Sequence, residues 1–414
     1  MAGRIIVIGA GPAGMFAAAT AARDGARVTV LEKNHRQGRK LMITGKGRCN
    51  ITNNTTVEGL VAGCAVGGRF LYSAFSRFSP ADTIGFFEER GVPLKTERGN
   101  RVFPVSDKAV DINDALVACC RERGVRFVTD SPVTAIETEN GRVTGVRTAD
   151  RLMPCDACIL ATGGASYPAT GSTGDGYAFA RALGHTVTPL SPSLVPLETA
   201  ERDCAEMQGL SLKNVGITVS DQKGKKVYED FGELLFTHFG LSGPVILSAS
   251  SHIRSAPGHV VSIDLKPALS AEKLDERIRR DFSEELNRDF ANSLGGLLPK
   301  SMIPVIVRRS GIPAETKINS VTREQRRALA ALLKAYKLNV AAFRPIDEAI
   351  VTSGGVATKE IDPKTMRSKL IGGLYFAGEI IDVDAHTGGF NLQIALSTGF
   401  CAGSEAAREL AGGQ

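Results

Sequence analysis

The chain has 414 residues, 43% of them hydrophobic and 23% charged, which describes an ordinary globular protein of two or three domains. A formal net charge of +6 is small for this length, so it disfavours a dedicated nucleic-acid binder and suits phosphates or acidic small molecules. The apolar runs are too short to span a membrane and the eight cysteines are scattered, so we expect a cytoplasmic protein with free thiols and no export signal.

A glycine-rich turn stands between an apolar run and an alanine-rich helix near the start of the chain. The run RIIVI predicts a buried parallel strand and leads into Gly9-Ala-Gly11-Pro-Ala-Gly14. In the dinucleotide-binding fingerprint, the first glycine permits a tight turn and the second lets the backbone approach a pyrophosphate. The third lets the helix pack on the sheet.

A second predicted strand, RVTVL, ends in Glu32, which completes that fingerprint. At this position the carboxylate accepts hydrogen bonds from ribose hydroxyls, and it disfavours a 2′-phosphate because two negative charges would face each other. Next come Lys33, Arg36, Arg39 and Lys40, and then TGKGRCN. This stretch is too polar for a core helix and too rich in glycine for a surface helix, so we expect a loop. Such a loop can lie along an extended dinucleotide and reach the flavin ring of FAD; a solvated basic loop is the alternative.

The middle of the chain reads as α/β structure. The predicted elements are a helix over 107–122, strands over 125–128, 133–136 and 142–147, a strand over 158–161, and a helix over 177–183. A glycine-rich loop follows the strand 158–161. Because ligands bind at the carboxyl ends of strands in open α/β sheets, this loop should face the same cofactor.

From about residue 191 the pattern changes to short strands, expected over 216–220, 226–228, 234–237 and 260–265. Apolar residues then recur every four positions from Leu274 to Phe290, which predicts an amphipathic helix, and Thr322 opens a capping box before a helix up to Tyr336. After 350 a strand over 374–377, an acidic loop, a glycine turn and a final helix follow. An α/β domain that is interrupted and then completed by the C-terminal segment accounts for this order.

Six ordered motifs resemble one family. They are GAGPAG, GRKLMITGKGRCNITN, ATGGASYPATGSTGDGY, GELLFTHFGLSGP, TSGGVATKEIDPKTMRSK and GLYFAGEIIDVDAHTGGFNLQIA. The chain resembles the bacterial NAD(P)/FAD-dependent oxidoreductases of the BaiN/YhiN type along almost its whole length. The resemblance implies a Rossmann-like FAD-binding domain in two segments, with an inserted β-barrel-like domain and a small helical domain. The expected ranges are 1–190 and 350–414 for the first, 191–267 and 310–349 for the second, and 268–309 for the third.

Carried over motif by motif, the resemblance implies contacts with each part of FAD. The ADP half would lie on Gly9, Ala10, Gly11, Pro12, Ala13, Gly14 and Glu32. The stretch from the pyrophosphate to the flavin would be lined by Lys33, Arg39, Lys40, Gly47, Arg48, Cys49 and Asn50. Val133 would touch adenine, and the ribose side would be closed by Ala161, Thr162 and Gly163.

The C-terminal motifs imply the flavin end of the site. Gly354, Gly355 and Val356 would approach the ring, and the ribityl chain and pyrimidine edge would be capped by Gly378, Glu379, Gly388, Gly389, Phe390, Asn391 and Leu392. A helix that starts near Phe390 would stabilise a reduced, anionic flavin through its dipole. Ala385-His386 replaces the glycine and variable residue that commonly stand there in the family, and this change could alter the mouth of the site.

Four residues are candidate catalytic groups: Tyr167, His238 and His386 as acids, and Arg48 as an anchor for substrate or flavin. For the histidines and the tyrosine, a packing role is the competing interpretation. Cys49 beside Arg48 lacks the second cysteine that a flavin disulfide reductase needs, and Cys155-Asp-Ala-Cys158 lacks further zinc ligands at compatible spacing. We therefore expect packing or flavin contact for Cys49, a structural role for Cys155 and Cys158, and no metal.

These features predict an FAD-dependent oxidoreductase that acts on a small molecule. Only one glycine fingerprint is present, so NAD(P)H would visit the flavin transiently; another electron carrier is the alternative. The family association suggests reduction of an activated C=C bond in a 3-keto steroid or bile-acid intermediate. A flavin-dependent RNA-modifying enzyme is compatible with the fold and the mild basic charge. It should show a coherent basic face beside the flavin, whereas Lys and Arg look interleaved with acids over 277–289. A non-catalytic flavin-binding protein is the third interpretation, and the sequence indicates no oligomeric state.

Overall fold

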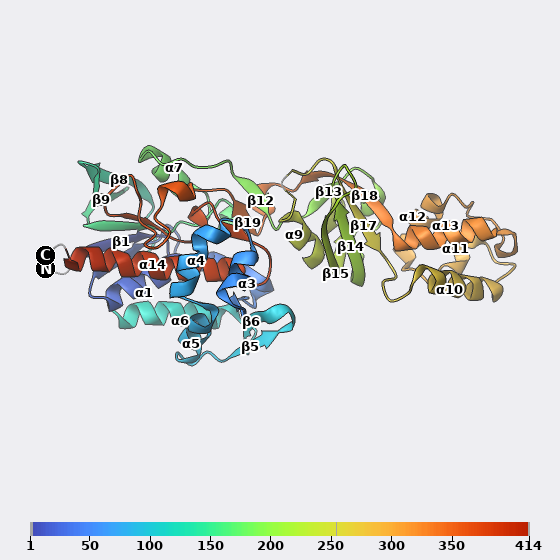
Figure 1. Cartoon of the computed structure of the whole chain (residues 1–414), viewed down its shortest axis with the longest axis horizontal. Helices are drawn as coiled ribbons and strands as arrows, with labels where there is room; N and C mark the ends of the chain where they lie inside the picture. Colours follow the sequence, from blue (N-terminus) through green and yellow to red (C-terminus); the bar gives the residue numbers. More distant parts are fainter. Residues whose placement is uncertain (1–2, 254, 413–414) are drawn as a thin grey trace. The chain divides into compact units, whose positions relative to one another are not determined.

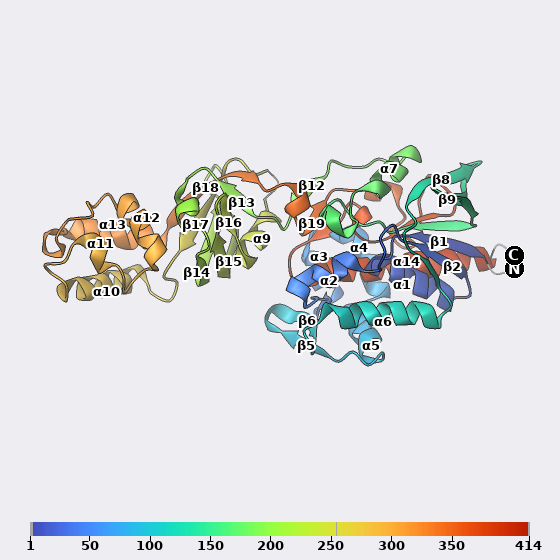
Figure 2. The ribbon, with the colours of Figure 1, turned by 180° about the vertical axis from the view of Figure 1, so that it is seen from behind.

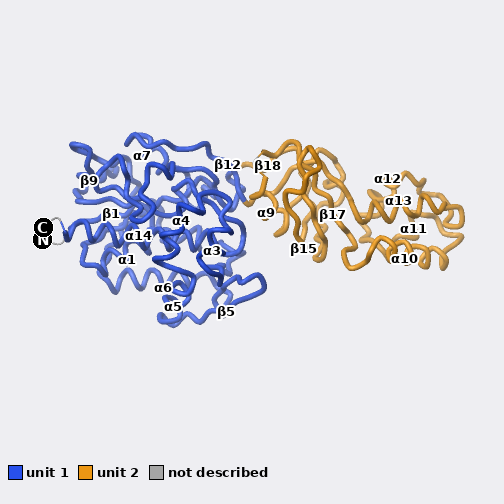
Figure 3. The backbone as a smooth tube through the Cα atoms, viewed as in Figure 1, with its two compact units in different colours: residues 1–193, 346–414 blue, residues 194–345 orange. Residues whose placement is uncertain are grey.

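The computed structural model describes residues 3–253 and 255–412. The chain forms two compact units, shown in separate colours in Figure 3. Unit 1 comprises residues 1–193 and 346–414, and unit 2 comprises residues 194–345. Within the described residues, we find no helix that combines the length and the apolar character needed to cross a membrane.

Unit 1 is built on a five-stranded parallel sheet in the order β20-β11-β1-β2-β7. Its strands are Arg4–Ile8 (β1), Arg27–Leu31 (β2), Arg126–Val128 (β7), Ala157–Leu160 (β11) and Leu374–Phe376 (β20). All four residues of β11 are buried, as expected for a strand covered on both faces. The sheet confirms the predicted Rossmann-like fold, with β20 supplied by the C-terminal segment.

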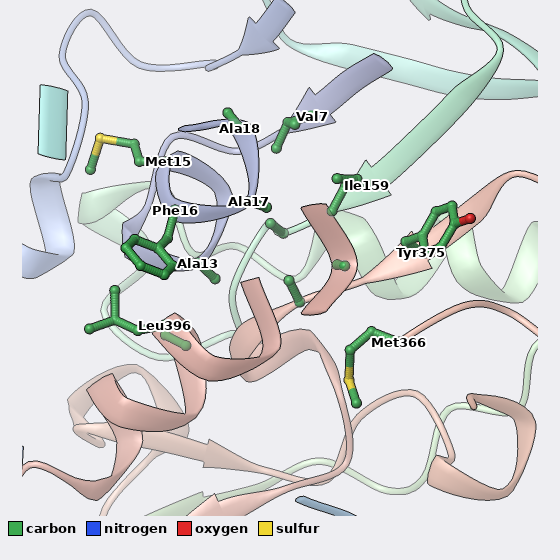
Figure 4. Close-up of a cluster of buried hydrophobic side chains, with 14 of the residues drawn as sticks. Val7, Ala13, Met15, Phe16, Ala17, Ala18, Ile159, Met366, Tyr375 and Leu396 are labelled. Carbon is green, nitrogen blue, oxygen red and sulfur yellow. The ribbon is translucent and has the colours of Figure 1, made fainter. Parts of the chain in front are cut away.

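Unit 1 also contains helices, of which the first and the last pack against this sheet (Figures 1 and 2). The helices are Pro12–Arg23 (α1), Arg39–Ile43 (α2), Val57–Ala62 (α3), Gly68–Arg77 (α4), Pro80–Glu88 (α5), Ala109–Glu122 (α6), Asp175–Ala182 (α7) and Phe390–Gly412 (α14). The first and last of them, α1 and α14, lie side by side. Figure 4 shows the core at this place, where Ala13, Phe16 and Ala17 of α1 lie near Leu396 of α14.

The contact between α1 and α14 depends on two glycines. A Cβ atom at Gly403 would lie 2.2 Å from the carbonyl oxygen of Ala17, and one at Gly399 would lie 2.5 Å from that of Ala13. Both distances are impossible for real side-chain atoms, so the two helices approach backbone to backbone. The two ends of the chain are thereby joined in one core.

Smaller sheets complete unit 1. They pair Thr52–Asn53 (β3) and Leu94–Glu97 (β5) with Arg101–Pro104 (β6); Val133–Glu139 (β8) and Leu152–Pro154 (β10) with Arg142–Thr148 (β9); Ser191–Ser193 (β12) with Val351–Ser353 (β19); and Cys64–Val66 (β4) with Asp384–Ala385 (β21). Two of these pairings, β12 with β19 and β4 with β21, again join the N-terminal segment to the C-terminal one.

Unit 2 contains a closed six-stranded barrel in the order β13-β16-β15-β14-β17-β18. Its strands are Leu197–Thr199 (β13), Ser211–Ser220 (β14), Lys226–Phe236 (β15), Gly240–Ser242 (β16), His259–Asp264 (β17) and Tyr336–Phe343 (β18). The two strands expected over 226–228 and 234–237 are one continuous strand, β15. The polar residues between them are held in register by β14, which pairs with β15 across most of its length.

Unit 2 also holds the helices Asp203–Glu206 (α8), Pro244–Ser250 (α9), Ala271–Ser283 (α10), Phe290–Ser293 (α11), Ile303–Ser310 (α12) and Arg323–Lys334 (α13). The capping box at Thr322 is confirmed, and α13 packs against α10. Residues 323–334, which fall in the range 310–349 expected for the β-rich domain, thus pack with a helix of the expected helical range 268–309, and the division of unit 2 into two domains stays a prediction.

The helix expected from Leu274 to Phe290 is wrong in its second half, because α10 ends at Ser283. Beyond that residue the backbone bonds to a distant segment instead of to itself. Leu286 accepts from the backbone N–H of Asn319, and the N–H of Phe290 donates to Thr316. These bonds satisfy backbone groups that a longer helix would have used.

Replacing Gly403 with alanine should destabilise the protein by about 1–3 kcal/mol, because the new methyl group meets backbone that cannot move aside alone. The matched control is Gly85→Ala in the middle of α5, where a Cβ would meet nothing within 4 Å. This control should raise stability by about 0.5–1 kcal/mol. Urea unfolding followed by circular dichroism measures both changes, and equal effects of the two substitutions would contradict the backbone contact.

Candidate functional site

The glycine turn between β1 and α1 contains two glycines that the chain's own packing requires. Gly9 has a φ of +104°, and a Cβ there would lie 2.5 Å from the carbonyl oxygen of Ala161. A Cβ at Gly14 would lie 1.9 Å from the carbonyl oxygen of Gly9. The first glycine therefore makes the turn, and the third lets α1 pack on its own turn and on β11.

The second glycine, Gly11, has a different environment. It precedes α1 with a φ of −77° and a ψ of 179°, a conformation open to any residue, and a Cβ there would meet nothing within 4 Å. No acidic side chain stands in the first turn of α1, and no side chain caps it. Open space beside Gly11 and a positive helix end suit the close approach of an anionic group, so the turn fits the pyrophosphate of a dinucleotide.

Glu32 follows β2 and is 8% exposed. Its Oε2 accepts from the backbone N–H of Ala10 at 2.9 Å, and its Oε1 accepts from the backbone N–H of Asn34 at 2.9 Å. These bonds fix the carboxylate at the carboxyl end of the sheet. The neighbouring Lys33 extends toward Asp175, with Nζ and Oδ2 2.7 Å apart.

A pocket at this edge brings together five of the predicted residues, Gly9, Glu32, Lys33, Val133 and Thr162. It is lined by Ile8, Gly9, Leu31, Glu32, Lys33, Ser131, Val133, Thr162, Gly171, Asp175 and Phe179. The Oγ1 atom of Thr162 is buried and has no hydrogen-bond partner among the described residues. Apolar walls, a fixed carboxylate and an unused hydroxyl fit a ribose and its base.

The basic segment after Lys33 is only partly the expected loop. The prediction is wrong for Arg39–Ile43, which form the short helix α2, because five side chains that tolerate helix stand in a row before the next glycine. The following residues do leave helical geometry: Gly45, Lys46, Gly47 and Cys49 all have positive φ angles. For Lys46 and Cys49 this conformation is strained.

Two cations of this segment bind carboxylates of the chain itself. Lys40 lies between Ser166 and Glu379, with its Nζ 2.7 Å from the Ser166 hydroxyl and 2.8 Å from Oε2 of Glu379. Glu379 also accepts from the backbone N–H of Thr352 at 2.8 Å. Lys40 and Glu379, both predicted to hold the cofactor, therefore join α2 to the C-terminal segment. Their contact with FAD stays a prediction.

Arg48 lies in a second group of ions. Its guanidinium donates to Glu97 at 2.5 Å and to Asp107 at 2.6 Å, and it stacks over the ring of Phe103 at 4.2 Å. Lys95 and Arg48 both donate to Asp107 and lower the pKa of that carboxyl. Because the charge of Arg48 is met inside the chain, its position favours a role in holding the loop over one as an anchor for an anion.

The loop 44–53 packs on the turn before α14. A Cβ at Gly389 would lie 2.3 Å from the carbonyl oxygen of Thr52, and the Asn53 side chain donates to the carbonyl of Gly388 at 3.0 Å. The Oδ1 atom of Asn50 is buried beside this turn and has no partner among the described residues. Two predicted groups, one from each end of the chain, are thus brought together at the start of α14.

The other predicted residues of the C-terminal segment shape tight backbone turns. Gly354, Gly355, Gly378, Gly388 and Gly389 all have positive φ angles, and Val356 is fully buried. The side chain of Asn391 exchanges two hydrogen bonds with the backbone of Ala385, which fixes the turn before α14. Helix α14 begins at Phe390, and Leu392 lies in its first turn. The first turn of α14 contains no acidic residue, as an anion-stabilising helix end requires.

The candidate acids lie in different places. Tyr167 is half-buried in the loop after β11, with a φ of +53°, directly after Ser166. His386 follows β21, and its backbone N–H donates to Gly63 at 3.0 Å. His238 belongs to unit 2, in the loop between β15 and β16, where its ring lies 5.0 Å from that of Phe239. Among the candidate acids, Tyr167 is therefore the next residue in the chain after Ser166, which bonds to Lys40 and Glu379.

Asp384 is a residue that sequence reasoning missed. It is 2% exposed, and burial raises its pKa, as do the negative charges of Asp382 and Glu379. Ser353 donates to it at 3.3 Å. The signal in the sequence is IIDVDA, in which two acids interrupt an otherwise apolar run.

The cysteines of the two sequence motifs lie in the interior of the protein. Cys49 is fully buried, and burial raises the pKa of its thiol to about 12, so it is not an activated thiolate. Cys155 and Cys158 are buried as well. In the part of the chain that the structure describes, no group of three or more His, Cys, Asp or Glu side chains could hold a metal ion.

Comparison with known proteins places the chain in a family. The family model of the HI0933-like protein Rossmann domain matches residues 3–405. The 3-dehydro-bile acid delta(4,6)-reductase of Clostridium scindens is 34% identical over 98% of this chain and 99% of its own length. The ribosomal RNA dihydrouridine synthase of Escherichia coli is 32% identical over 95% of each chain. The 3-ketosteroid delta1-dehydrogenase of Sterolibacterium denitrificans shares the fold, with a TM-score of 0.53 and 15% identity over 99% of both chains.

The fold and the glycine turn define a protein that binds a dinucleotide in a two-segment Rossmann-like domain. The chain belongs to the HI0933-like family, and it is an FAD-dependent oxidoreductase.

Replacing Gly11 with alanine should weaken FAD binding by about 10-fold or more without lowering the stability of the cofactor-free protein, because the new methyl group meets only the space assigned to the pyrophosphate. Gly14→Ala is the control, since its methyl group meets backbone and should lower stability even without FAD. Thermal melting of both apoproteins and quenching of FAD fluorescence give the two readouts. Wild-type FAD affinity in the Gly11→Ala variant would show that no phosphate approaches this residue.

Proposed function

We propose that the protein uses electrons from NAD(P)H to reduce a C=C bond conjugated to a carbonyl group. The observation that carries this proposal is the chemistry shared by two relatives that match almost the whole chain. A 3-dehydro bile acid with a delta-4 double bond and the uracil ring of uridine both contain a C=C bond next to a carbonyl. Saturation of that bond is what the names of the two relatives have in common. The substrates differ, but the reacting group is the same.

The reaction needs a hydride on the carbon β to the carbonyl and a proton on the α carbon, so that the double bond becomes a single bond and the donor is oxidised. When bound, FAD supplies hydride transfer. The chain's own residues hold the cofactor and provide the proton. The turn at Gly11 and the carboxylate of Glu32 would bind the ADP half, and the start of α14 would lie at the flavin end.

We assign Tyr167 as the residue that donates the proton. Its backbone is held in a left-handed conformation that only the surrounding loop can impose, and its neighbour Ser166 bonds to both Lys40 and Glu379. A phenol in this position could donate its proton to the α carbon and recover it from solvent. The ion-paired Arg48 is a weaker candidate, because Glu97 and Asp107 already occupy its donors.

The first candidate substrate is a 3-keto steroid or bile-acid intermediate, which the relative from Clostridium scindens supports. The second is RNA. One observation favours it: the segment 266–337 carries fifteen lysines and arginines against nine aspartates and glutamates. That excess of six equals the formal net charge of the whole chain, +6, so all the remaining residues together are neutral. A non-catalytic flavin-binding role would leave this charge distribution and the shared chemistry of the relatives without a purpose.

Anaerobic stopped-flow mixing of the FAD-loaded protein with NADH, and separately with NADPH, tests the donor. We expect rapid bleaching of the flavin absorption with one or both, followed by reoxidation on addition of a 3-keto-Δ4 steroid or a uridine-containing RNA. Mass spectrometry should show the gain of two hydrogens in the substrate that reacts. Absence of bleaching with both nucleotides at full FAD occupancy would overturn the NAD(P)H proposal, and a reduced flavin that no conjugated C=C compound reoxidises would overturn the proposed reaction.

Replacing Tyr167 with phenylalanine should slow substrate reduction by about 100-fold or more and leave flavin reduction by NAD(P)H unchanged, because the proton is needed only in the second half-reaction. Tyr72→Phe, on the exposed face of α4, is the matched control and should change neither rate. Separate stopped-flow measurements of the two half-reactions give the readout. Equal losses in both halves, or no loss at all, would exclude Tyr167 as the proton donor.

A further inference from the structure

Helix α13 carries four bases and one acid, and it packs against α10, which carries four of each. Helix α10 and helix α13 lie side by side, with α11 and α12 beside them (Figure 1). Acids and bases alternate along α10 in the sequence, and that alternation by itself argues against a basic face. In the folded chain α13 packs beside α10, so Arg323, Arg326 and Arg327 of α13 add to the charge at this place.

Three arginines act on one aspartate where these helices meet, and a fourth lies one helical turn away. Asp275 on α10 accepts from Arg326 at 2.7 and 3.1 Å, through both oxygens. Arg327 and Arg279 also lower the pKa of Asp275, so both guanidinium groups lie close enough to act on it. Arg323 stands one turn before Arg327 on α13. We call Arg279, Arg323, Arg326 and Arg327 the α10–α13 arginine cluster.

Attraction to Glu324 offsets only part of the cost of this arrangement: hydrogen bonds at the start of α13 lower the pKa of that carboxyl, and the charges of Arg323 and Arg327 lower it further. Arg323 and Arg327 are exposed and four residues apart on one helix, where like charges repel by a few tenths of a kcal/mol. Arg323 is also the first residue of α13, at the positive end of the helix dipole, where a cation is unfavourable. Glu324 is the acidic residue in that first turn. Arginines placed at a cost to the helix are expected where they bind an anion.

Two arginines of α12, also in unit 2, are matched to carboxylates. Arg308 donates to Glu206 and Asp203, each at 2.9 Å, and Arg309 donates to Asp203 at 2.6 Å. That pair anchors α12 to α8 and has a structural purpose. The α10–α13 arginine cluster differs. Asp275 pairs with Arg326, whereas the other three guanidinium groups form no ion pair of 4 Å or less among the described residues.

We propose that the α10–α13 arginine cluster binds the phosphate backbone of an RNA. Guanidinium forks match phosphate oxygens in pairs, and arginines one turn apart on a helix can reach separate phosphates of one strand. The identity of the polyanion rests on the RNA form of the proposed function. The cluster itself would position the nucleic acid and read no sequence, because phosphate contacts carry none.

Fluorescence anisotropy of a labelled RNA hairpin, titrated with the FAD-loaded full chain at roughly 50 to 200 mM KCl, tests the cluster. The double variant Arg323→Gln, Arg327→Gln should bind more weakly at every salt concentration. Its slope of log affinity against log salt should be shallower by about 2, near one unit for each phosphate that the variant no longer neutralises. Its melting temperature should be unchanged or higher, because a like-charge pair has been removed.

The matched control is Lys223→Gln, Lys225→Gln in the exposed turn between β14 and β15, which removes the same charge from the same unit. It should leave RNA affinity and the salt slope close to wild type. Equal slopes for the two double variants would overturn the proposal, as would a melting temperature that falls together with binding. Binding of poly-glutamate with the same affinity as the hairpin would assign the cluster to an acidic protein and also overturn it.

The same variants separate this proposal from the proposed function. Flavin reduction by NAD(P)H and reduction of a small 3-keto-Δ4 steroid should be unaffected by both double substitutions, because neither pair lies in the unit that holds the cofactor residues. A protein that binds RNA through the cluster but reduces no conjugated C=C bond would refute the reaction and keep the surface. A protein that reduces such bonds but binds RNA equally well without the cluster would refute the surface and keep the reaction.

Discussion

The close packing of the backbones of α1 and α14 is the constraint on which the rest of the structure depends. It is possible only because Gly399 and Gly403 have no side chains where the helix passes Ala13 and Ala17. Helix α1 begins at the glycine turn, and α14 begins at the turn of Gly388 and Gly389. When the two helices dock, the pyrophosphate end and the proposed flavin end of the site are fixed within one core. The Thr398 hydroxyl on α14, which accepts from the backbone N–H of Gly378, fixes a third turn in the same way.

This arrangement explains why the domain can be interrupted. The parallel sheet takes β20 from the C-terminal segment, and β12 and β4 of the N-terminal segment pair with β19 and β21 of the C-terminal one. Residues 194–345 can therefore form a unit of their own, with a closed barrel that has no free sheet edge to protect. The unit that contains the predicted cofactor residues and the inserted unit have separate hydrophobic cores. They can change independently of each other.

Local patterns were enough to predict β1, the glycine turn, α1, β2 and the final helix, since each depends on residues within a few positions of one another. The partners of the basic segment were out of reach for the opposite reason. Glu379 lies 339 residues after Lys40, and Glu97 and Asp107 lie 49 and 59 residues after Arg48. The run of cations therefore predicted an anion-binding loop, whereas Lys40 and Arg48 form ion pairs that hold the segment in place. Similarly, the apolar period after Leu274 continued past Ser283, but backbone bonds to residues 316–319 ended the helix.

Those internal ion pairs change the electrostatic argument for the cofactor. Lys40 and Arg48 are paired with carboxylates of the chain, whereas Arg39 donates to the amide oxygen of Asn34. The backbone N–H groups at the start of α1, where there is open space and no acidic residue, can therefore supply much of the positive potential that receives a pyrophosphate. Side-chain cations are then available for other partners. The residues outside 266–337 are neutral in sum, so an acidic substrate or polymer would meet attraction chiefly at the helices of unit 2. A neutral steroid gains nothing from such charge and a bile acid can pair its one carboxylate, whereas a phosphate backbone can pair several charges at once. The arginines of α10 and α13 therefore weigh on the choice between the two substrates.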